Sequence, residues 1–137
     1  MFILDTNVVS ELRKAKKAHE NVRKWAQGLP AASLYISAVS VLELEIGILL
    51  VERRDRKQGA VLRVWMDEHV LPTFYGRILT IDNVVAQRCA ALHVPNPRAD
   101  RDALIAATAL VHGMTVVTRN VSHFQPMVTV VVNPWEP

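Results

Sequence analysis

The sequence has 137 residues, of which 50% are hydrophobic and 21% are charged, and it contains one cysteine, Cys89. This length predicts a single domain spanning residues 1–137, and the composition excludes disordered, collagen-like and low-complexity chains. A lone cysteine cannot form an internal disulfide, so a reducing, cytoplasmic location is expected. The formal net charge is +3, from 16 Lys and Arg against 13 Asp and Glu, which indicates a modest preference for polyanionic partners.

No apolar run is long enough for a membrane span, which needs about 18 residues or more. The longest such stretch, residues 39–51, is interrupted by Ser40, Glu43, Glu45 and Gly47. The chain also begins without the basic segment that is typical of a secretory signal peptide. Association with a membrane is therefore not predicted.

Short apolar runs alternate with longer, helix-like segments along the chain. We expect strands at residues 2–4, 34–36, 77–81, 115–118 and 128–132. We expect helices at residues 7–12, 19–27, 38 to about 56, 57–71, 84–94 and 101–112. This alternation predicts an α/β fold with a mostly parallel central sheet of about five strands and helices on both faces.

Several residues mark helix ends in this scheme. Ser37, Asp82 and Asp100 each stand just before a predicted helix, where a short polar side chain can cap the free backbone N–H groups. Gly113 follows residues 101–112 and is expected to end that helix.

Three carboxylates belong to the same end of the predicted sheet. Asp5 directly follows the first strand, and Asp102 lies in the first turn of a helix rich in small residues. Glu43 lies in an apolar helix, where burying an unpaired carboxylate costs several kcal/mol. Each residue also has a simpler explanation. Asp5 could be a helix cap, Glu43 the partner of an arginine, and Asp102 a charge at a positive helix end.

No single explanation of this kind accounts for all three carboxylates together. Converging carboxylates repel one another unless a cation lies between them. Oxygen ligands favour a hard divalent cation, so the sequence predicts Mg²⁺, with Mn²⁺ as the other candidate. The histidines are scattered and have no ligand spacing with Cys89, which leaves no zinc site. We interpret them as surface or structural residues (His19, His69, His93, His112 and His123).

Four segments in this order resemble the PIN-domain ribonucleases, and most closely the VapC toxin family with its FitB-like branch. They are LDTN at residues 4–7, SAVSVLELEIG at residues 37–47, DALIAATA at residues 102–109, and VTRN at residues 117–120 followed by Phe124. The closing NPW at residues 133–135 is similar to that branch as well.

The resemblance implies a PIN-like fold and the toxin component of a type II toxin–antitoxin system. It also implies a metal-dependent endoribonuclease that hydrolyses RNA phosphodiester bonds with a metal-activated water. The family's acidic site maps onto Asp5, Glu43, Asp102 and Asn120, with Asp5 and Asp102 as the Mg²⁺ ligands and no further cofactor. Asn120 departs from the aspartate common in the family, which puts a second metal in doubt. Thr118 matches a hydroxyl position expected to orient a carboxylate or a water.

The implied partners are an RNA substrate and a VapB-like antitoxin. The apolar helix that begins near Val39 has hydrophobic residues on several sides, more than a single hydrophobic core would bury. We therefore expect a homodimer, or a larger toxin–antitoxin hetero-oligomer. The same surface is also compatible with simple burial in a small domain. Two basic clusters, together with Arg98, Arg101 and Arg119, are candidates to follow the RNA backbone. The clusters comprise Arg13, Lys14, Lys16, Lys17, Arg23 and Lys24, and then Arg53, Arg54, Arg56 and Lys57. Aromatic residues make up only 6% of the chain, and no stacking platform for bases is expected.

Other functions remain open at this point. Asn120 is compatible with a catalytically impaired PIN-like module that only binds nucleic acid. A phospho-acceptor signalling domain would need a pair of acids after the first strand and a late lysine, whereas this chain offers Asp5 alone and then Thr118-Arg119-Asn120. DNA in place of RNA as the substrate is not decided by the sequence.

Overall fold

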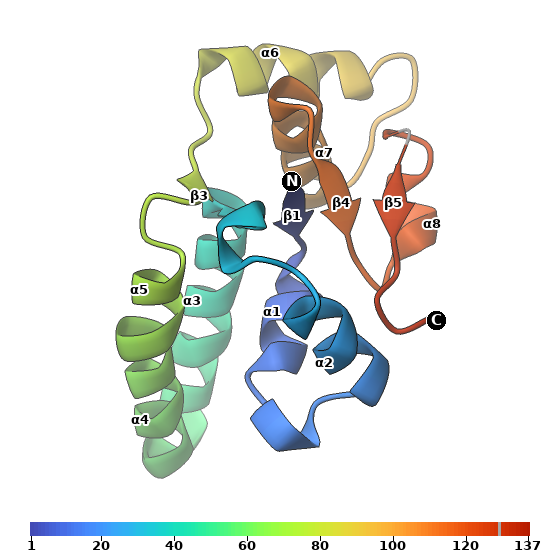
Figure 1. The fold of residues 1–137 in the computed structure, drawn as a ribbon. Helices are drawn as coiled ribbons and strands as arrows, with labels where there is room; N and C mark the ends of the chain where they lie inside the picture. Colours follow the sequence, from blue (N-terminus) through green and yellow to red (C-terminus); the bar gives the residue numbers. More distant parts are fainter. Residues whose placement is uncertain (129) are drawn as a thin grey trace.

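A computed structural model of the chain describes residues 1–128 and 130–137. Within these ranges the centre of the fold is a five-stranded sheet with the order β3-β2-β1-β4-β5. Neighbouring strands pair in parallel throughout. The strands are β1 (Phe2–Leu4), β2 (Leu34–Ser37), β3 (Ile78–Leu79), β4 (Thr115–Val117) and β5 (Val131–Val132), and Figure 1 shows β1, β4 and β5 side by side. The predicted α/β fold with a parallel sheet is confirmed.

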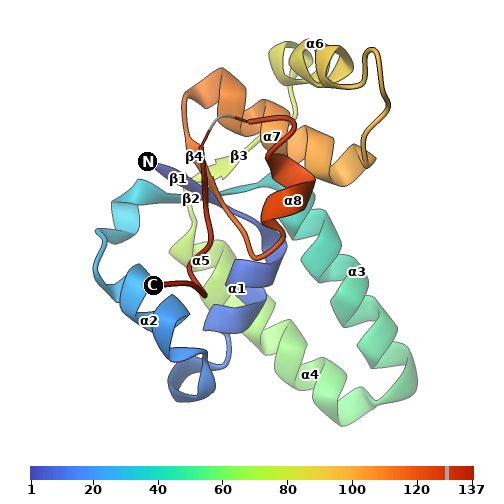
Figure 2. The same ribbon diagram turned by 90° about the vertical axis from the view of Figure 1, so that its right-hand side faces the viewer.

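Helices cover both faces of this sheet. They are α1 (Thr6–Leu12), α2 (Glu20–Gln27), α3 (Ala38–Arg54), α4 (Arg56–Trp65), α5 (Leu71–Thr73), α6 (Asn83–Leu92), α7 (Asp100–His112) and α8 (Val121–Phe124). Short 3-10 turns occur at Ala15–Lys17 and Ala31–Ser33, and a π-helical turn occurs at Met66–Val70. The view in Figure 2 shows α6 and α7 on one side of the strands and the paired helices α3 and α4 extending on the other.

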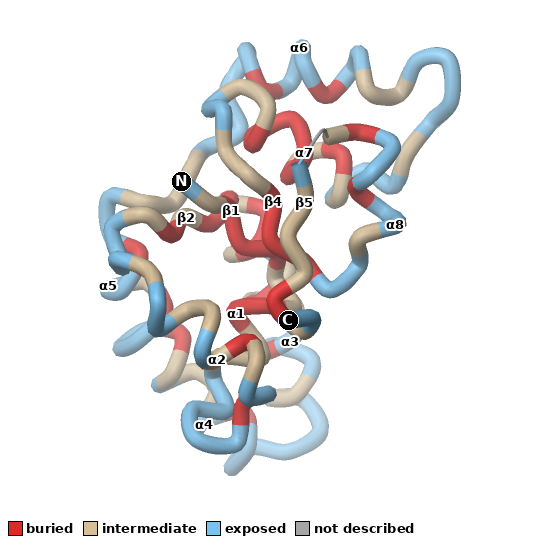
Figure 3. The backbone as a smooth tube through the Cα atoms, turned by 45° about the vertical axis from the view of Figure 1, so that its right-hand side comes forward, coloured by how far each residue is buried: buried red, intermediate tan, exposed pale blue. Residues whose placement is uncertain are grey.

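Two hydrophobic clusters result from the alternation of side chains along the strands. Ile3 and Val116 point into the cluster beneath α6, α7 and α8. Leu4 and Val117, the next residues along, point into the cluster beneath α1 to α5. Figure 3 accordingly shows buried backbone along β1, β4 and much of α7. None of the described helices combines the length and hydropathy that crossing a bilayer requires.

The predicted caps agree with the structure except for Asp100. The Ser37 and Asp82 side chains accept hydrogen bonds from Val39 N at 3.0 Å and Val85 N at 2.9 Å, and Gly113 ends α7 with a φ of 65°. The prediction for Asp100 is wrong, because Ala99 holds the N-cap position and Asp100 is already helical. The Asp100 carboxylate instead lies 3.6 Å from His93 Nε2.

Three predicted elements differ from the observed ones. The helix expected at residues 57–71 is divided by the π-helical turn before Pro72, a residue that has no N–H for the helical ladder. The strand expected at residues 77–81 is reduced to Ile78–Leu79, because Arg77 N donates to Phe74 O in a turn. The last strand is Val131–Val132, and Thr129 of the predicted range lies outside the described residues.

Helices α3 and α4 form a close antiparallel pair. Arg63 on α4 joins them through hydrogen bonds to Glu45 on α3 at 3.0 and 2.8 Å, and its guanidinium lies 3.5 Å from Glu52. Gly59 faces Glu52 so closely that a Cβ atom there would lie 2.7 Å from the Glu52 Cα atom. The pair therefore depends on a glycine at this position.

We expect Gly59→Ala to lower the free energy of unfolding by about 1–3 kcal/mol, the usual cost of overpacking. Thermal and urea unfolding measure this change. Gly47→Ala on α3 is the matched control, because a Cβ atom there would meet nothing within 4 Å. That substitution should stabilise the helix by up to about 1 kcal/mol. Similar effects of the two substitutions would contradict the close approach at Gly59.

Candidate active site

The strand order places a crevice beside β1. Strands β2 and β3 lie on one side of β1, and β4 and β5 lie on the other. The connection that leaves β1 and the connection that leaves β4 therefore run in opposite directions along the sheet. In open parallel sheets, ligands bind at such a point, beyond the carboxyl ends of the strands. Asp5 directly follows β1, and Thr118 directly follows β4.

A pocket of about 500 Å³ opens at this point. Asp5, Glu43, Asp102 and Asn120 all line it. The other lining residues include a fourth acid, Glu11, and the basic and aromatic residues Arg13, Lys14, Arg119 and Trp135. The four residues predicted for the site thus line one pocket, although they come from separate elements.

Asp5 is the most buried of the acidic residues, with 5% of its surface exposed. Burial raises the pKa of its carboxyl group above the ordinary value of 3.8, and the nearby charges of Asp102 and Glu43 raise it further. Hydrogen bonds oppose this rise in pKa: Thr118 Oγ1 donates to Oδ2 at 2.8 Å, and Thr6 N donates to Oδ1 at 2.8 Å. The second bond makes Asp5 the N-cap of α1 as well, so the capping explanation is confirmed, and a place in the pocket is compatible with it.

Only one oxygen of the Glu43 carboxylate, Oε1, accepts a hydrogen bond from a described residue. Thr6 Oγ1 donates to Glu43 Oε1 at 2.7 Å and is also within 3.0 Å of Ser40 Oγ. The pairing with an arginine that the sequence leaves open is found with Arg101, whose Nη1 lies 3.8 Å from Glu43 Oε2. Arg101 is exposed, so this long contact does not replace a bound cation.

Asp102 is brought to the pocket by the first turn of α7. Its Oδ2 lies 3.3 Å from Nδ1 of His123, which is a largely exposed residue of α8. Within the described residues, Asp5 has no cationic partner at all. The three carboxylates are therefore not each neutralised by a guanidinium of their own.

The family is decided by comparison with known proteins. The PIN domain model matches residues 2–125. The chain is a PIN-domain protein. It is 37% identical to toxin FitB of Neisseria gonorrhoeae over 140 residues, with 98% of this chain and 99% of FitB covered. It is 34% identical to VapC ribonuclease Y4jK of Sinorhizobium fredii over 142 residues, with 100% and 99% covered.

A solved structure agrees with this assignment. The FitAcB crystal structure from Neisseria gonorrhoeae matches with a TM-score of 0.90 and 36% identity, and the match covers 100% of both chains. The predicted resemblance is confirmed, and within the PIN-domain family the chain groups with the VapC and FitB toxins. The roles of Asp5, Glu43, Asp102 and Asn120 in this PIN domain stay predictions.

The acidic residues of this PIN domain can be tested for their fit to a metal ion. Among residues 1–128 and 130–137, no three His, Cys, Asp or Glu side chains form a cluster tight enough to hold a metal by themselves. Mg²⁺ does not need such a cluster, because it is commonly bound by one or two carboxylates and keeps several waters. The buried Asp5 carboxylate, whose pKa the nearby charges of Asp102 and Glu43 raise, fits such an ion.

Two residues of the PIN domain were missed by sequence reasoning. His123 is exposed, as expected of a surface residue, but its Nδ1 atom also contacts Asp102 Oδ2. Trp135 lines the acid pocket with the Arg119 guanidinium 5.3 Å above its ring, although no aromatic platform was expected. The NPW segment was the available signal for Trp135, whereas nothing in the local sequence marked His123.

The Thr118 hydroxyl links Asp5 to the backbone of Asn120. Besides donating to Asp5, its hydroxyl accepts a hydrogen bond from Asn120 N at 2.9 Å. We expect Thr118→Val to raise the pKa of Asp5 further and to lower the free energy of unfolding by about 1–3 kcal/mol at neutral pH. Because a protonated Asp5 needs this donor less, the loss should shrink as the pH falls. Urea unfolding at several pH values measures it.

Thr108→Val provides the matched control. Thr108 is equally buried, but its hydroxyl donates to Leu104 O at 2.7 Å within α7 and meets no carboxylate. Its loss of stability should be the same at each pH. An equal pH dependence for both variants would argue against the role of Thr118 at Asp5.

Proposed function

We propose that this VapC-type protein is the toxin of a cytoplasmic type II toxin–antitoxin pair and that it hydrolyses RNA with Mg²⁺ or Mn²⁺. The observation that carries the proposal is the buried carboxylate of Asp5, which shares one pocket with Glu43 and Asp102 and has no cationic partner among the described residues. The name of VapC ribonuclease Y4jK favours RNA over DNA as the substrate. The FitB relative, which is named a toxin, favours the toxin role.

The proposed ion would be held by Asp5 and Asp102, with Glu43 acting directly or through water. Bound there, it would offset charge on the scissile phosphate and lower the pKa of a water molecule. Thr6 and Thr118 fix the carboxylates of Glu43 and Asp5 through their hydroxyl hydrogen bonds. Glu43 Oε2 accepts no hydrogen bond in the described part of the chain. It is the atom we expect to receive the proton of the attacking water.

The basic rim of the pocket is suited to the phosphates on either side of the scissile bond. Arg13, Lys14 and Arg119 line the pocket together with the acids. Arg119 forms no ion pair within the described residues, and the indole of Trp135 holds its guanidinium in place. Its N–H groups therefore stay available for phosphate oxygens.

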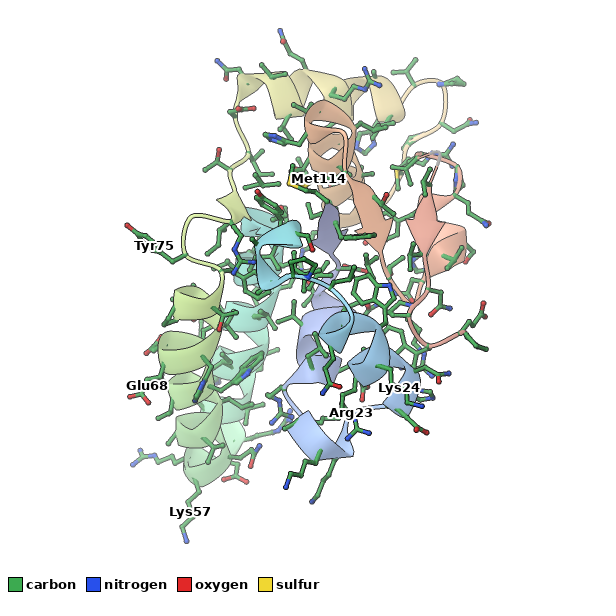
Figure 4. The ribbon with its side chains drawn as sticks, in the orientation of Figure 1. Arg23, Lys24, Lys57, Glu68, Tyr75 and Met114 are labelled. Carbon is green, nitrogen blue, oxygen red and sulfur yellow. The ribbon has the colours of Figure 1, made fainter. Side chains whose placement is uncertain are left out.

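The two basic clusters contribute unequally to this rim. Figure 4 shows Lys57 at the far tip of the α3–α4 pair and Arg23 and Lys24 on α2, away from the strand ends. None of the second cluster lines the pocket. Of the first cluster, only Arg13 and Lys14 line it. Contact with the RNA backbone is thus proposed for these two residues and Arg119.

We also propose an antitoxin and a second copy of the chain as protein partners. Leu42, Leu49 and Leu50 on α3 are each at least half exposed, which is unusual for large apolar side chains that have no partner to cover them. A homodimer, or a larger toxin–antitoxin assembly, would cover this surface. Analytical ultracentrifugation of the free chain and of the co-expressed pair tests the two assemblies.

Growth arrest and RNA cleavage test the proposed function together. Expression of the wild-type chain should arrest growth, and the Asp102→Asn variant should relieve the arrest. The purified chain with Mg²⁺ should produce fragments with 5′-phosphate and 3′-hydroxyl ends. Equal RNA decay with the wild type and the variant, or cyclic phosphate ends, would contradict the proposal.

Asn120 favours one alternative, a catalytically impaired module that binds nucleic acid. Its side chain lies at the exposed rim and supplies no negative charge. Such a module would bind RNA, with an affinity that depends on salt, and would leave it intact in Mg²⁺ and in Mn²⁺. The cleavage assay therefore separates the two functions directly.

A further inference from the structure

A second cavity adjoins the acid pocket at Asp102. It has a volume of about 340 Å³ and lies between the loop before α7 and the segment formed by α8 and the residues after it. Figure 2 shows α8 beside the start of α7, and the two helices are in contact. Asp102 lines both cavities, so one extended ligand can occupy both.

Arg98 provides an uncommitted cation in this cavity. Its Nε atom is buried and has no hydrogen-bond partner in the part of the chain that the structure describes. The loop that carries it is anchored, because Arg98 N donates to His93 Nδ1 at 3.1 Å. An unpaired buried donor is costly, so this guanidinium is suited to receive acceptor oxygens from a ligand.

The remaining walls suit a nucleoside. Pro97 and Met127 offer apolar surface against which a flat ring can pack, and Ser122 offers a hydroxyl group. His123 lies where the cavities meet, with its Nδ1 atom 3.3 Å from Asp102 Oδ2. An arginine beside an apolar slot is the combination that recognises a phosphate joined to a base.

We propose that this cavity binds the nucleotide next to the scissile phosphate of the RNA. Arg98 binds the phosphate of that nucleotide, and the walls formed by Pro97 and Met127 receive its base. The inference rests on the proposed function, because the RNA strand must pass over Asp102 to enter both cavities. It adds a site that selects a base, whereas the rim of the acid pocket contacts phosphates alone.

Arg98→Gln tests the phosphate contact. We expect the KM for single-stranded RNA to rise roughly tenfold, as for loss of one charge-assisted hydrogen bond, with little change in kcat. The slope of log KM against log salt concentration should fall by about 0.7, the value for one phosphate contact on a single strand. Damage to the fold would not produce this change of slope.

Arg88→Gln is the matched control for charge. Arg88 is an exposed residue of α6 that lines neither cavity, so its loss should leave the KM and the salt slope unchanged. A fall in slope of the same size with both variants would show a general charge effect and overturn the proposal.

Ser122→Phe tests the base contact by filling the cavity from an exposed position. The wild type and the variant are given a random-sequence RNA, and the fragment ends are sequenced. We expect the base preference at one position beside the cut to change. If the wild type cleaves but both cavity variants keep its KM, salt slope and end sequences, the proposed nucleotide site is wrong.

Failure of the proposed function would be seen separately. In that case the wild type itself leaves RNA intact, and the salt slopes are measured for RNA binding by fluorescence anisotropy instead. A lower slope for Arg98→Gln than for Arg88→Gln would then support the nucleotide site without catalysis. Equal slopes would overturn it.

Discussion

Asp5→Asn is expected to reduce RNA hydrolysis by about a thousandfold or more, because a metal ion contributes several kcal/mol of transition-state stabilisation. The substitution keeps the size of the side chain and leaves an oxygen for the hydrogen bond from Thr118, which now lies at 2.8 Å. It removes the negative charge that would hold the ion, and its amide NH₂ group takes the place of the oxygen that accepts from Thr6 N. Single-turnover cleavage of a labelled RNA in saturating Mg²⁺ measures the loss.

The same substitution should stabilise the metal-free protein at neutral pH. The pKa of Asp5 is raised, mainly by burial, so ionisation of Asp5 destabilises the folded state. In the wild type, this residue's favourable contribution to stability is present below its ordinary value of 3.8 and is lost as the pH rises through the higher pKa of the folded state. Asp5→Asn should remove that component of the pH dependence.

Opposite effects on stability and activity are the expected sign of a functional charge. Urea unfolding of both proteins at acidic and at neutral pH, in the presence of EDTA, measures this component, because burial raises the pKa of Asp5 above its ordinary value. A variant that is less stable than the wild type at neutral pH would show that Asp5 acts mainly as the cap of α1. A variant that still cleaves RNA at the wild-type rate would remove Asp5 from the mechanism.

The central part of the fold could be predicted because its signals are local. Phe2, Ile3 and Leu4 form an apolar run that ends at Asp5, which predicts both a buried strand and a polar group at its carboxyl end. Alternation with helices then predicts the parallel sheet. The strand order, and with it the meeting of Asp5 and Asp102 beside β1 and β4, follows from tertiary packing.

Features that depend on contacts between distant segments were less accessible. Asp100 has the side chain of a good cap, yet Ala99 occupies the cap position and Asp100 lies near His93. His123 is separated from Asp102 by most of α7 and by β4, so its contact has no counterpart in sequence spacing. Trp135 reaches the pocket because the last residues return to α2, where Asn21 Nδ2 donates to Trp135 O at 2.7 Å.

A carboxylate can be introduced into the site at position 120 without loss of a capping hydrogen bond. Asp5 and Glu43 are held by hydroxyl hydrogen bonds inside the pocket. Asn120 lies at the rim as the N-cap residue of α8, and its side chain makes no capping hydrogen bond. A carboxylate at this position would therefore disturb no existing contact and would face the same pocket.

Removal of divalent cations with EDTA is expected to abolish RNA hydrolysis by the wild type, and Mg²⁺ or Mn²⁺ should restore it. With Asn at position 120, we expect activity to rise with Mg²⁺ concentration as for a single site. Asn120→Asp should lower the half-activating Mg²⁺ concentration by about tenfold, since an added carboxylate contributes on the order of 1.4 kcal/mol to cation binding. A steeper, cooperative rise with this variant would indicate a second ion.

The melting temperature provides a second readout of the same ion. A cation that binds only the folded state at a hundred times its Kd adds about 2.7 kcal/mol of stability. Mg²⁺ should therefore raise the melting temperature of the wild type, should raise that of Asn120→Asp at lower concentrations, and should leave that of Asp5→Asn almost unchanged. Full RNA cleavage in EDTA, or an equal effect of Mg²⁺ on all three proteins, would mean that the acid pocket does not hold the ion. Because Asp5, Glu43 and Asp102 would then repel one another without compensation, a cationic group of another kind would have to be found in the pocket.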